Sequence, residues 1–206
     1  SGTSAIHIRI TDDAGNVGTA TTQAYTLDTT APTMTIASGT VTSGDTSNDA
    51  TIALTFTSSE STTGFAAGDV TVSAGTISSF AGSGASYSAT FTPSSDATFT
   101  ISVAASAYAD TAGNNNAVSN TFTWTYDSTA LTITIASTTS GVTSGSTTND
   151  ASIAVTFTTS ESTTGFAADD VTVSGGTLSS FAGSGTDYTA TFTPSADGAT
   201  TIDVAS

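Results

Sequence analysis

Two stretches of this chain repeat each other almost letter for letter, and this repetition limits the possible folds more than any other feature. Residues 60–72 recur as 161–173 with a single difference, at a separation of 101 residues. Residues 80–84 recur as 181–185 at the same separation. A period of about 100 residues indicates an array of similar domains, each with its own core.

The repeat also divides the chain into parts. Asp-Asp-Ala-Gly-Asn at 12–16 matches Asp-Thr-Ala-Gly-Asn at 110–114. The alignment predicts three segments: 1–28 as the C-terminal strands of a preceding repeat, 29–127 as a complete repeat, and 128–206 as the next repeat, truncated before its last strand. We therefore expect the 206 residues to be an excerpt of a longer array.

Short runs of alternating apolar and polar residues predict strands within the complete repeat. Ile52, Leu54 and Phe56 would share one face of a strand, because side chains alternate between the two faces. Seven such runs are separated by Gly, Ser, Asn or Asp, at 33–37, 51–57, 69–73, 76–80, 86–92, 98–104 and 120–126. We predict an all-β fold of tandem immunoglobulin-like, seven-stranded β-sandwiches with Greek-key connections.

The charge balance excludes two classes of partner. The chain has 17 acidic residues, one basic residue and a formal net charge of −16. This charge repels nucleic acid phosphates and anionic lipid, and it attracts cations. No apolar run approaches the ~20 residues that span a bilayer, so we expect no membrane insertion in this segment. Cysteine is absent, which is compatible with a bacterial surface protein stabilised by means other than disulfides.

The sandwich topology groups the acidic residues at the ends of each repeat. Successive connections alternate between the two ends, and one end of the complete repeat collects Asp28, Glu60, Asp69, Asp110 and Asn114. The opposite end carries Asp45, Asn48, Asp49 and Asp96, facing Asp127, Glu161, Asp169 and Asp170 of the next repeat. Clustered carboxylates repel one another unless a cation binds them. Calcium accepts six to eight oxygen ligands in flexible geometry.

We therefore expect calcium at or near each junction. The candidate ligands are Asp28, Glu60, Asp69, Asp110, Asn114, Asp127, Glu161, Asp169 and Asp170. The alternative is that these residues only cap turns and keep the surface soluble, which Asp and Asn do for local reasons.

The sequence predicts no catalytic site. His7 is the single histidine, in a strand pattern that predicts a solvent-facing side chain. Glu60 and Asp69 could be posed as a glycosidase pair, but they come from one connection and recur in each copy, which favours a structural role. Trp124 is expected to pack in the core. We expect that the chain is not an enzyme.

The motifs together resemble a known family. Asp-x-Ala-Gly-Asn, then Asp-Thr-Thr-Ala-Pro at 28–32, then Glu-Ser-Thr-Thr-Gly-Phe at 60–65, are similar to bacterial Ig-like domains. This family forms long arrays in large cell-surface adhesins and biofilm-associated proteins, and resembling arrays use calcium to stiffen their junctions. The second boundary departs from the pattern, because Leu131 stands where the proline is usual.

The resemblance implies a structural stalk or extender segment of a secreted or cell-surface, adhesin-like protein. Its partners would be neighbouring repeats of the same chain. Two alternatives stay open: lateral assembly with other copies into an extracellular filament or sheath, and a glycan- or protein-binding accessory module of a secreted enzyme. Many gene-encoded copies would favour the stalk, and two or three beside a hydrolase would favour the accessory module.

Overall fold

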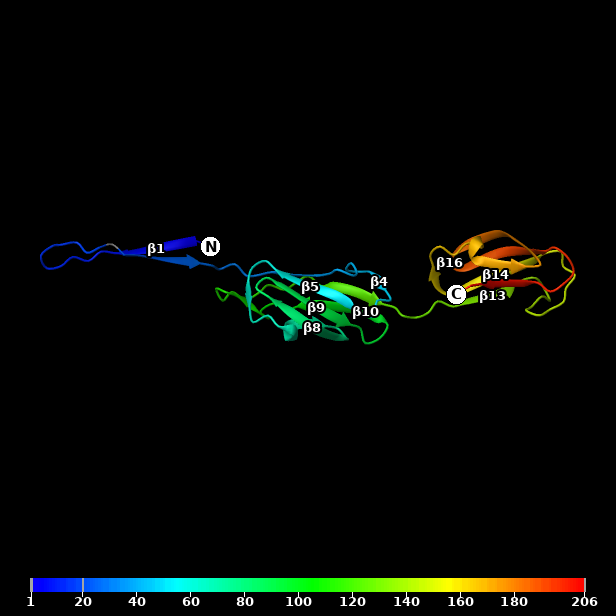
Figure 1. The fold of residues 1–206 in the computed structure, drawn as a ribbon, viewed down its shortest axis with the longest axis horizontal. Coiled ribbons are helices and arrows are strands. Elements are labelled where there is room, and N and C mark those ends of the chain that lie inside the picture. Colours follow the sequence, from blue (N-terminus) through cyan, green and yellow to red (C-terminus); the bar gives the residue numbers. More distant parts are fainter. Residues whose placement is uncertain (1, 20, 206) are drawn as a thin grey trace. The chain divides into compact units, whose positions relative to one another are not determined.

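The computed structural model describes residues 2–19 and 21–205, and its regular secondary structure is almost entirely β-strand (Figure 1). The chain forms two compact units, residues 1–128 and 129–206. The described helices are two single 3-10 turns, and neither is long or apolar enough to cross a membrane.

The chain begins with an antiparallel hairpin of β1 (Gly2–Ile8) and β2 (Thr21–Leu27). Several large apolar side chains of this hairpin are exposed, with Ile8 at 69% and Leu27 at 63%. The predicted orientation of the His7 side chain lies outside the described residues.

Two four-stranded sheets form the first sandwich. The strands of one sheet, in spatial order, are β3 (Met34–Ser38), β5 (Ile52–Ser58), β9 (Ser86–Thr92) and β8 (Thr76–Ser83). The strands of the other are β4 (Thr46–Ser47), β12 (Phe122–Tyr126), β10 (Ala97–Val103) and β7 (Val70–Val72). A small ladder pairs β6 (Thr62–Thr63) with β11 (Ala109–Asp110), and a 3-10 turn, η1 (Ala67–Asp69), precedes β7.

The core of this sandwich follows the predicted alternation. Ile52, Leu54 and Phe56 of β5 are 0–1% exposed, while the residues between them face solvent. Trp124 is also fully buried, and its indole N–H donates to Ser47 Oγ at 3.0 Å. The burial of apolar side chains from both sheets drives the two faces together.

The seven predicted strands are all present, and the two four-stranded sheets contain β4 as an eighth strand. After β3 the chain turns at Gly44, whose φ of +99° favours glycine, and then joins the opposite sheet. The first predicted strand, β3, therefore belongs to one sheet, and β4, which follows it, belongs to the other. Two strand residues flanked by polar turns are too few for a periodic pattern to reveal.

Both sandwiches contain the same irregularity. Ser79 and Ser180 have φ values of 51° and 54°, and the β8–β9 register shifts between Ser78 and Ala81. This β-bulge adds a residue, so that Ile77 and Phe80 pack against the same core although they lie three positions apart.

The second unit has a similar arrangement of its longer strands, without a counterpart of β4 among its described residues. One sheet has the strands β13 (Ile133–Ser137), β14 (Ile153–Thr163) and β16 (Gly176–Pro194). The other pairs β15 (Val171–Ser174) with β17 (Thr201–Val204), and η2 (Ala168–Asp170) precedes β15. Its core contains Phe157 and Phe192 at the positions of Phe56 and Phe91.

Candidate metal centre

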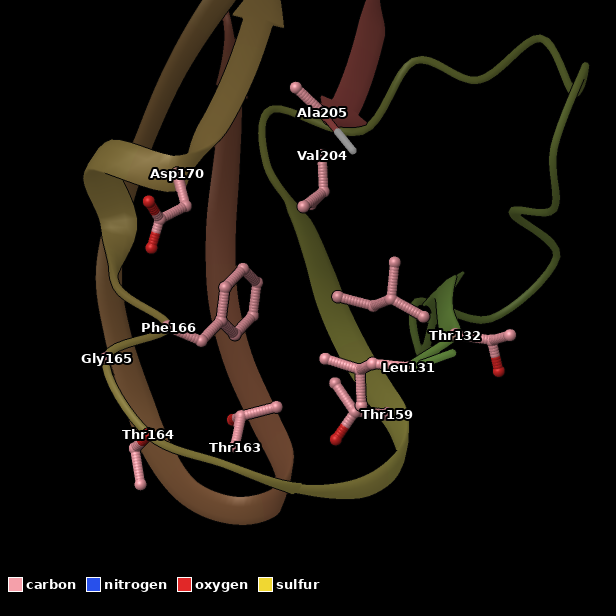
Figure 2. A pocket seen from close by; sticks show the side chains of 11 residues that line it. Leu131, Thr132, Thr159, Thr163, Thr164, Gly165, Phe166, Asp170, Val204 and Ala205 are labelled. Atoms are coloured by element: carbon pink, nitrogen blue, oxygen red, sulfur yellow. The ribbon is translucent and has the colours of Figure 1, made fainter. Parts of the chain in front are cut away.

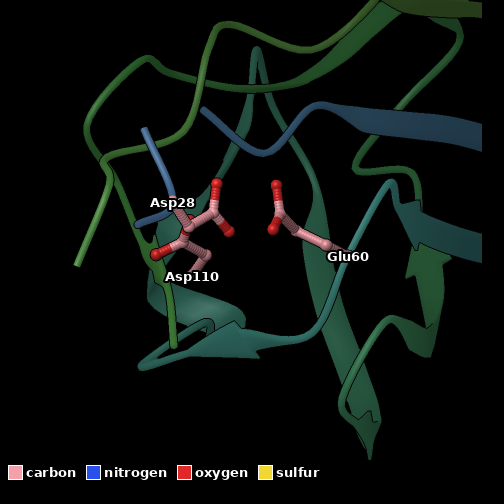
Figure 3. Close-up of side chains that lie close together, drawn as sticks. All are labelled: Asp28, Glu60 and Asp110. Carbon is pink, nitrogen blue, oxygen red and sulfur yellow. The ribbon is translucent and has the colours of Figure 1, made fainter. Parts of the chain in front are cut away.

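Three carboxylates from distant parts of the sequence meet at one end of the first sandwich. Asp28, Glu60 and Asp110 each offer an oxygen within 4.8 Å of the other two. Figure 3 shows Asp28 and Glu60 pointing toward one another, with Asp110 beside Asp28. We call these three residues the carboxylate cluster.

Each side chain of the cluster is positioned by a different element. Asp28 directly follows β2, and its Oδ1 accepts the backbone N–H of Thr30 at 3.0 Å, which turns the chain toward β3. Glu60 lies between β5 and β6. Asp110 belongs to β11, and the pairing of Asp110 with Thr62 brings it close to Glu60.

Asp110 is the anchor of the cluster, because its side chain is only 2% exposed. Its Oδ1 accepts the backbone N–H of Asn114 and its Oδ2 accepts the side-chain amide of Asn114, both at 2.8 Å. The same amide donates to the backbone carbonyl of Asp28 at 3.1 Å. Asn114 therefore ties β11 to the segment that precedes β3.

The Asp-x-Ala-Gly-Asn motif builds this turn locally. Asp12 accepts the same two hydrogen bonds from Asn16, also at 2.8 Å, in the hairpin, where both residues are exposed. The motif thus forms the same turn at a place where the described residues include no group of three metal-ligating side chains. Only the burial of Asp110, and its proximity to Asp28 and Glu60, distinguishes the second copy.

The electrostatics of the cluster are unbalanced. Desolvation raises the pKa of Glu60, and the negative charges of Asp28 and Asp110 raise it further. Desolvation also acts to raise the pKa of Asp110, but the hydrogen bonds from Asn114, Gly113 and Ala112 together outweigh it, so that the pKa is lowered. The chain has no lysine and one arginine to compensate such charges.

The donor set fits a hard divalent cation. Three carboxylates supply six oxygens, and a carboxylate oxygen that accepts one hydrogen bond keeps a second lone pair for a metal. Calcium tolerates this irregular arrangement better than magnesium, which demands near-octahedral geometry. A bound cation would supply the positive charge that the side chains of the cluster lack.

The other predicted ligands lie in different settings. The carboxylate of Asp69 accepts the backbone N–H of Ala66 at 2.8 Å and caps η1, and Asp170 does the same for Ala167 before η2. Neither belongs to a described group of metal-ligating side chains. Asp169 is exposed. Asp127 and Glu161 occupy the positions of Asp28 and Glu60, and the counterpart of Asp110 would fall at 211, after the last residue.

The acidic residues at the opposite end of the first sandwich accept hydrogen bonds from backbone and hydroxyl groups of the same unit. Asp45 Oδ2 accepts the N–H of Thr42 at 2.7 Å, and Asp49 Oδ2 accepts the Ser47 hydroxyl at 2.7 Å. Asp96 Oδ1 accepts both the N–H and the hydroxyl of Ser128, at 3.1 and 2.8 Å. This last contact fixes the start of the segment that leaves the sandwich. It is a feature that the sequence pattern did not reveal.

A cavity of about 470 Å³ lies in the second unit. Figure 2 shows Phe166 on one side of it and Leu131 and Val204 on the other. In the first sandwich, the ring of Tyr108 fills the equivalent space, 5.2 Å from that of Phe65, the counterpart of Phe166. The segment that carries Tyr108 has no counterpart within the 206 residues.

The raised pKa of Glu60 predicts a pH dependence for the metal-free protein. A raised pKa stabilises the fold fully below the unfolded value of 4.5, and this stabilisation is lost as pH rises through the folded value. The lowered pKa of Asp110 has the opposite sign, since its stabilisation is lost as pH falls. In chelator, Glu60→Gln should flatten the decline of the melting temperature above pH 4.5 and raise the value at pH 7.

The measurement is the fluorescence melt of Trp124, the single tryptophan, which reports only the first sandwich. Glu161→Gln, at the matching position of the second unit, should leave this transition unchanged. Equal pH slopes for Glu60→Gln and the unmodified chain would show that the cluster is not under charge strain.

Comparison with known proteins agrees with the fold. A family model described as bacterial Ig-like domain matches residues 28–126 and again residues 127–206. Comparisons with curated proteins and with solved structures gave no match. Domains of this kind are typically non-catalytic and are commonly extracellular or surface-exposed. With both of its sandwiches matched, the chain belongs to the bacterial Ig-like domain family.

Proposed function

We propose that this chain is a stalk or extender segment of a large secreted or cell-surface, adhesin-like protein, and that calcium stiffens the junctions between its repeats. Calcium would bind Asp28, Glu60 and Asp110, with Asn114 holding Asp110 and the backbone of Asp28 in place. The segment has no catalytic role in this proposal. Its partners are the neighbouring repeats of the same chain.

The observation that carries the proposal is that the three residues of the carboxylate cluster come from both sides of a repeat boundary. Asp28 lies at the boundary between the hairpin and the first sandwich, whereas Glu60 and Asp110 belong to the sandwich itself. A cation shared by these side chains would restrain the backbone at the point where one repeat passes into the next. Repeats that contact only their neighbours depend on such restraints for their rigidity.

Calcium is expected to raise the melting temperature of the first sandwich. A ligand present at 100 times its Kd stabilises the fold by about 2.7 kcal/mol, or by roughly 10 °C or more for a domain of this size. The test compares the Trp124 fluorescence melt in calcium chloride with that in excess chelator. An unchanged transition would refute metal binding.

Variants locate the site. Asp110→Asn and Glu60→Gln should abolish most of the calcium-dependent rise. Asp45→Asn, in a turn at the other end of the sandwich, should keep it. If Asp45→Asn removes the rise and Asp110→Asn does not, calcium binds elsewhere on the chain.

Stiffening needs a separate measurement. The protein has no cysteine, so Gln23→Cys in the hairpin and Ala97→Cys in the sandwich, both exposed positions, give a unique pair of spin labels. Pulsed electron paramagnetic resonance should show a distance distribution that narrows on adding calcium. A melting temperature that rises while the distribution stays broad would support a metal site without the stalk mechanism.

A further inference from the structure

The first and last segments of the first sandwich run side by side in the same direction. Strand β12 pairs with β4 in parallel, with Thr125 opposite Thr46 and Tyr126 opposite Ser47. The other strand pairs of this sandwich are antiparallel. We call the contact between residues 32–47 and residues 117–127 the seam.

Hydrogen bonds cross the seam along its whole length. The backbone bonds run from Ala117 N to Pro32 O (2.9 Å), Gly44 N to Thr123 O (2.8 Å), Thr125 N to Asp45 O (2.9 Å) and Asp127 N to Ser47 O (3.1 Å). Side chains add the bonds from Thr123 N to Ser43 Oγ and from Trp124 Nε1 to Ser47 Oγ, both at 3.0 Å.

Asn120 bridges the part of the seam where no backbone ladder exists. Strand β3 belongs to the other sheet, so its backbone has no strand partner on this side. The Asn120 side chain replaces that partner: its Oδ1 accepts the Ile36 N–H at 2.7 Å, and its amide donates to the Ile36 carbonyl at 2.9 Å. Because Ile36 is buried, these bonds also satisfy groups that water does not reach.

The parallel direction decides how the seam responds to tension. The chain enters at residue 32 and leaves at residue 127, which lie at opposite ends of the seam. Pulling the two ends of the repeat apart therefore slides the two segments along each other, and the bonds share the load. If both segments were pulled from the same end, the bonds would open one after another.

We propose that the first repeat bears tension along the chain, and that the seam with its Asn120 bridge is the element that resists unfolding under force. This inference rests on the proposed stalk function and adds the mechanical element within the repeat. A stalk that holds a distal domain is pulled along its length, and the unfolding rate governs survival under force.

The direction of pulling tests the proposal without changing the fold. A pair of cysteines at the exposed positions Thr29 and Ala130 serves as attachment points that pull on the seam from opposite ends. A pair at Thr29 and the exposed Ala112 pulls on the seam from one end. In optical tweezers, the first pair should unfold at least about tenfold more slowly at the same force, equivalent to about 1.4 kcal/mol in the barrier. Equal rates in the two geometries would overturn the proposal.

The Asn120→Ala variant tests the bridge. In the Thr29/Ala130 geometry, it should unfold about tenfold faster at fixed force, since both hydrogen bonds of the bridge to Ile36 are lost. Thr98→Val is the control, because it removes a side-chain bond of 2.8 Å to Thr125 that joins β10 to β12 and does not cross the seam. Equal acceleration by the two variants would reject a special role for Asn120.

These outcomes are separate from those that test calcium. Loss of the calcium-dependent melting shift, with retained direction dependence, would refute the metal and keep the seam. A retained calcium-dependent melting shift, with equal unfolding rates in the two pulling directions, would keep the metal and refute the seam.

Discussion

Phe56→Ala is expected to unfold the first sandwich at temperatures where the unmodified chain is folded. The ring is fully buried, and its centroid lies 5.8 Å from that of Phe65 and 6.1 Å from that of Phe80. Removing a buried phenylalanine ring costs about 3–5 kcal/mol, because the transfer energy is lost and a cavity remains. A small domain has only about 5–15 kcal/mol of stability in total. The melting temperature should fall by more than about 10 °C.

The repeat supplies a matched control. Phe157, at the equivalent position of the second unit, is also fully buried, and the rings of Phe166 and Phe181, the counterparts of Phe65 and Phe80, lie 5.8 Å from its ring. Phe157→Ala should lower a transition seen by circular dichroism and leave the Trp124 fluorescence transition unchanged. If Phe157→Ala lowers the Trp124 transition as much as Phe56→Ala does, the two units do not unfold independently.

The second large effect is expected from Asn116→Ala. The Asn116 side chain is 3% exposed, and its Oδ1 accepts the N–H of the buried Tyr108 at 2.9 Å. Its amide donates to the carbonyls of Ala104 and Ala117, both at 2.7 Å. An alanine leaves the Tyr108 N–H unsatisfied in the interior. Together with the two lost donors, this predicts a loss of about 2–4 kcal/mol.

The loss should reach the carboxylate cluster as well. Asn116 holds the segment 104–117 in place, and that segment carries Asp110 and Asn114. The calcium-dependent rise in melting temperature should therefore shrink in Asn116→Ala. Asn115→Ala is the control, because its side chain is exposed and its bridge to Ala109 uses only the backbone. It should change stability by less than about 0.5 kcal/mol.

Phe56→Ala and Asn116→Ala, both measured by Trp124 fluorescence, separate two contributions to the stability of the first sandwich. Phe56 contributes through packing and has no link to the cluster other than the fold. Asn116 contributes through hydrogen bonds that shape the cluster. An Asn116→Ala protein whose calcium response is intact would show that Asp110 does not need the 104–117 segment to be ordered by Asn116.

The sequence by itself determined the fold class and the seven strands that carry a periodic pattern. The alternation at 52–56 has one interpretation once a period of about 100 residues is recognised, because a strand that buries one face must place every second side chain there. The family relationship follows from the same motifs. The connection pattern also predicted that Asp28, Glu60 and Asp110 lie at one end, which is where the structure places them.

Only the tertiary structure decided what each polar residue does. Asn114, Asn115 and Asn116 are three identical letters in a row, yet the first binds Asp110, the second is exposed and the third is buried against Tyr108. Asp69 resembles Glu60 in the pattern, but a 3-10 turn directs its carboxylate to the N–H of Ala66. The bridge from Asn120 to Ile36 joins residues 84 positions apart. Such contacts depend on distance and direction in space, whereas periodicity records only which face of a strand is apolar.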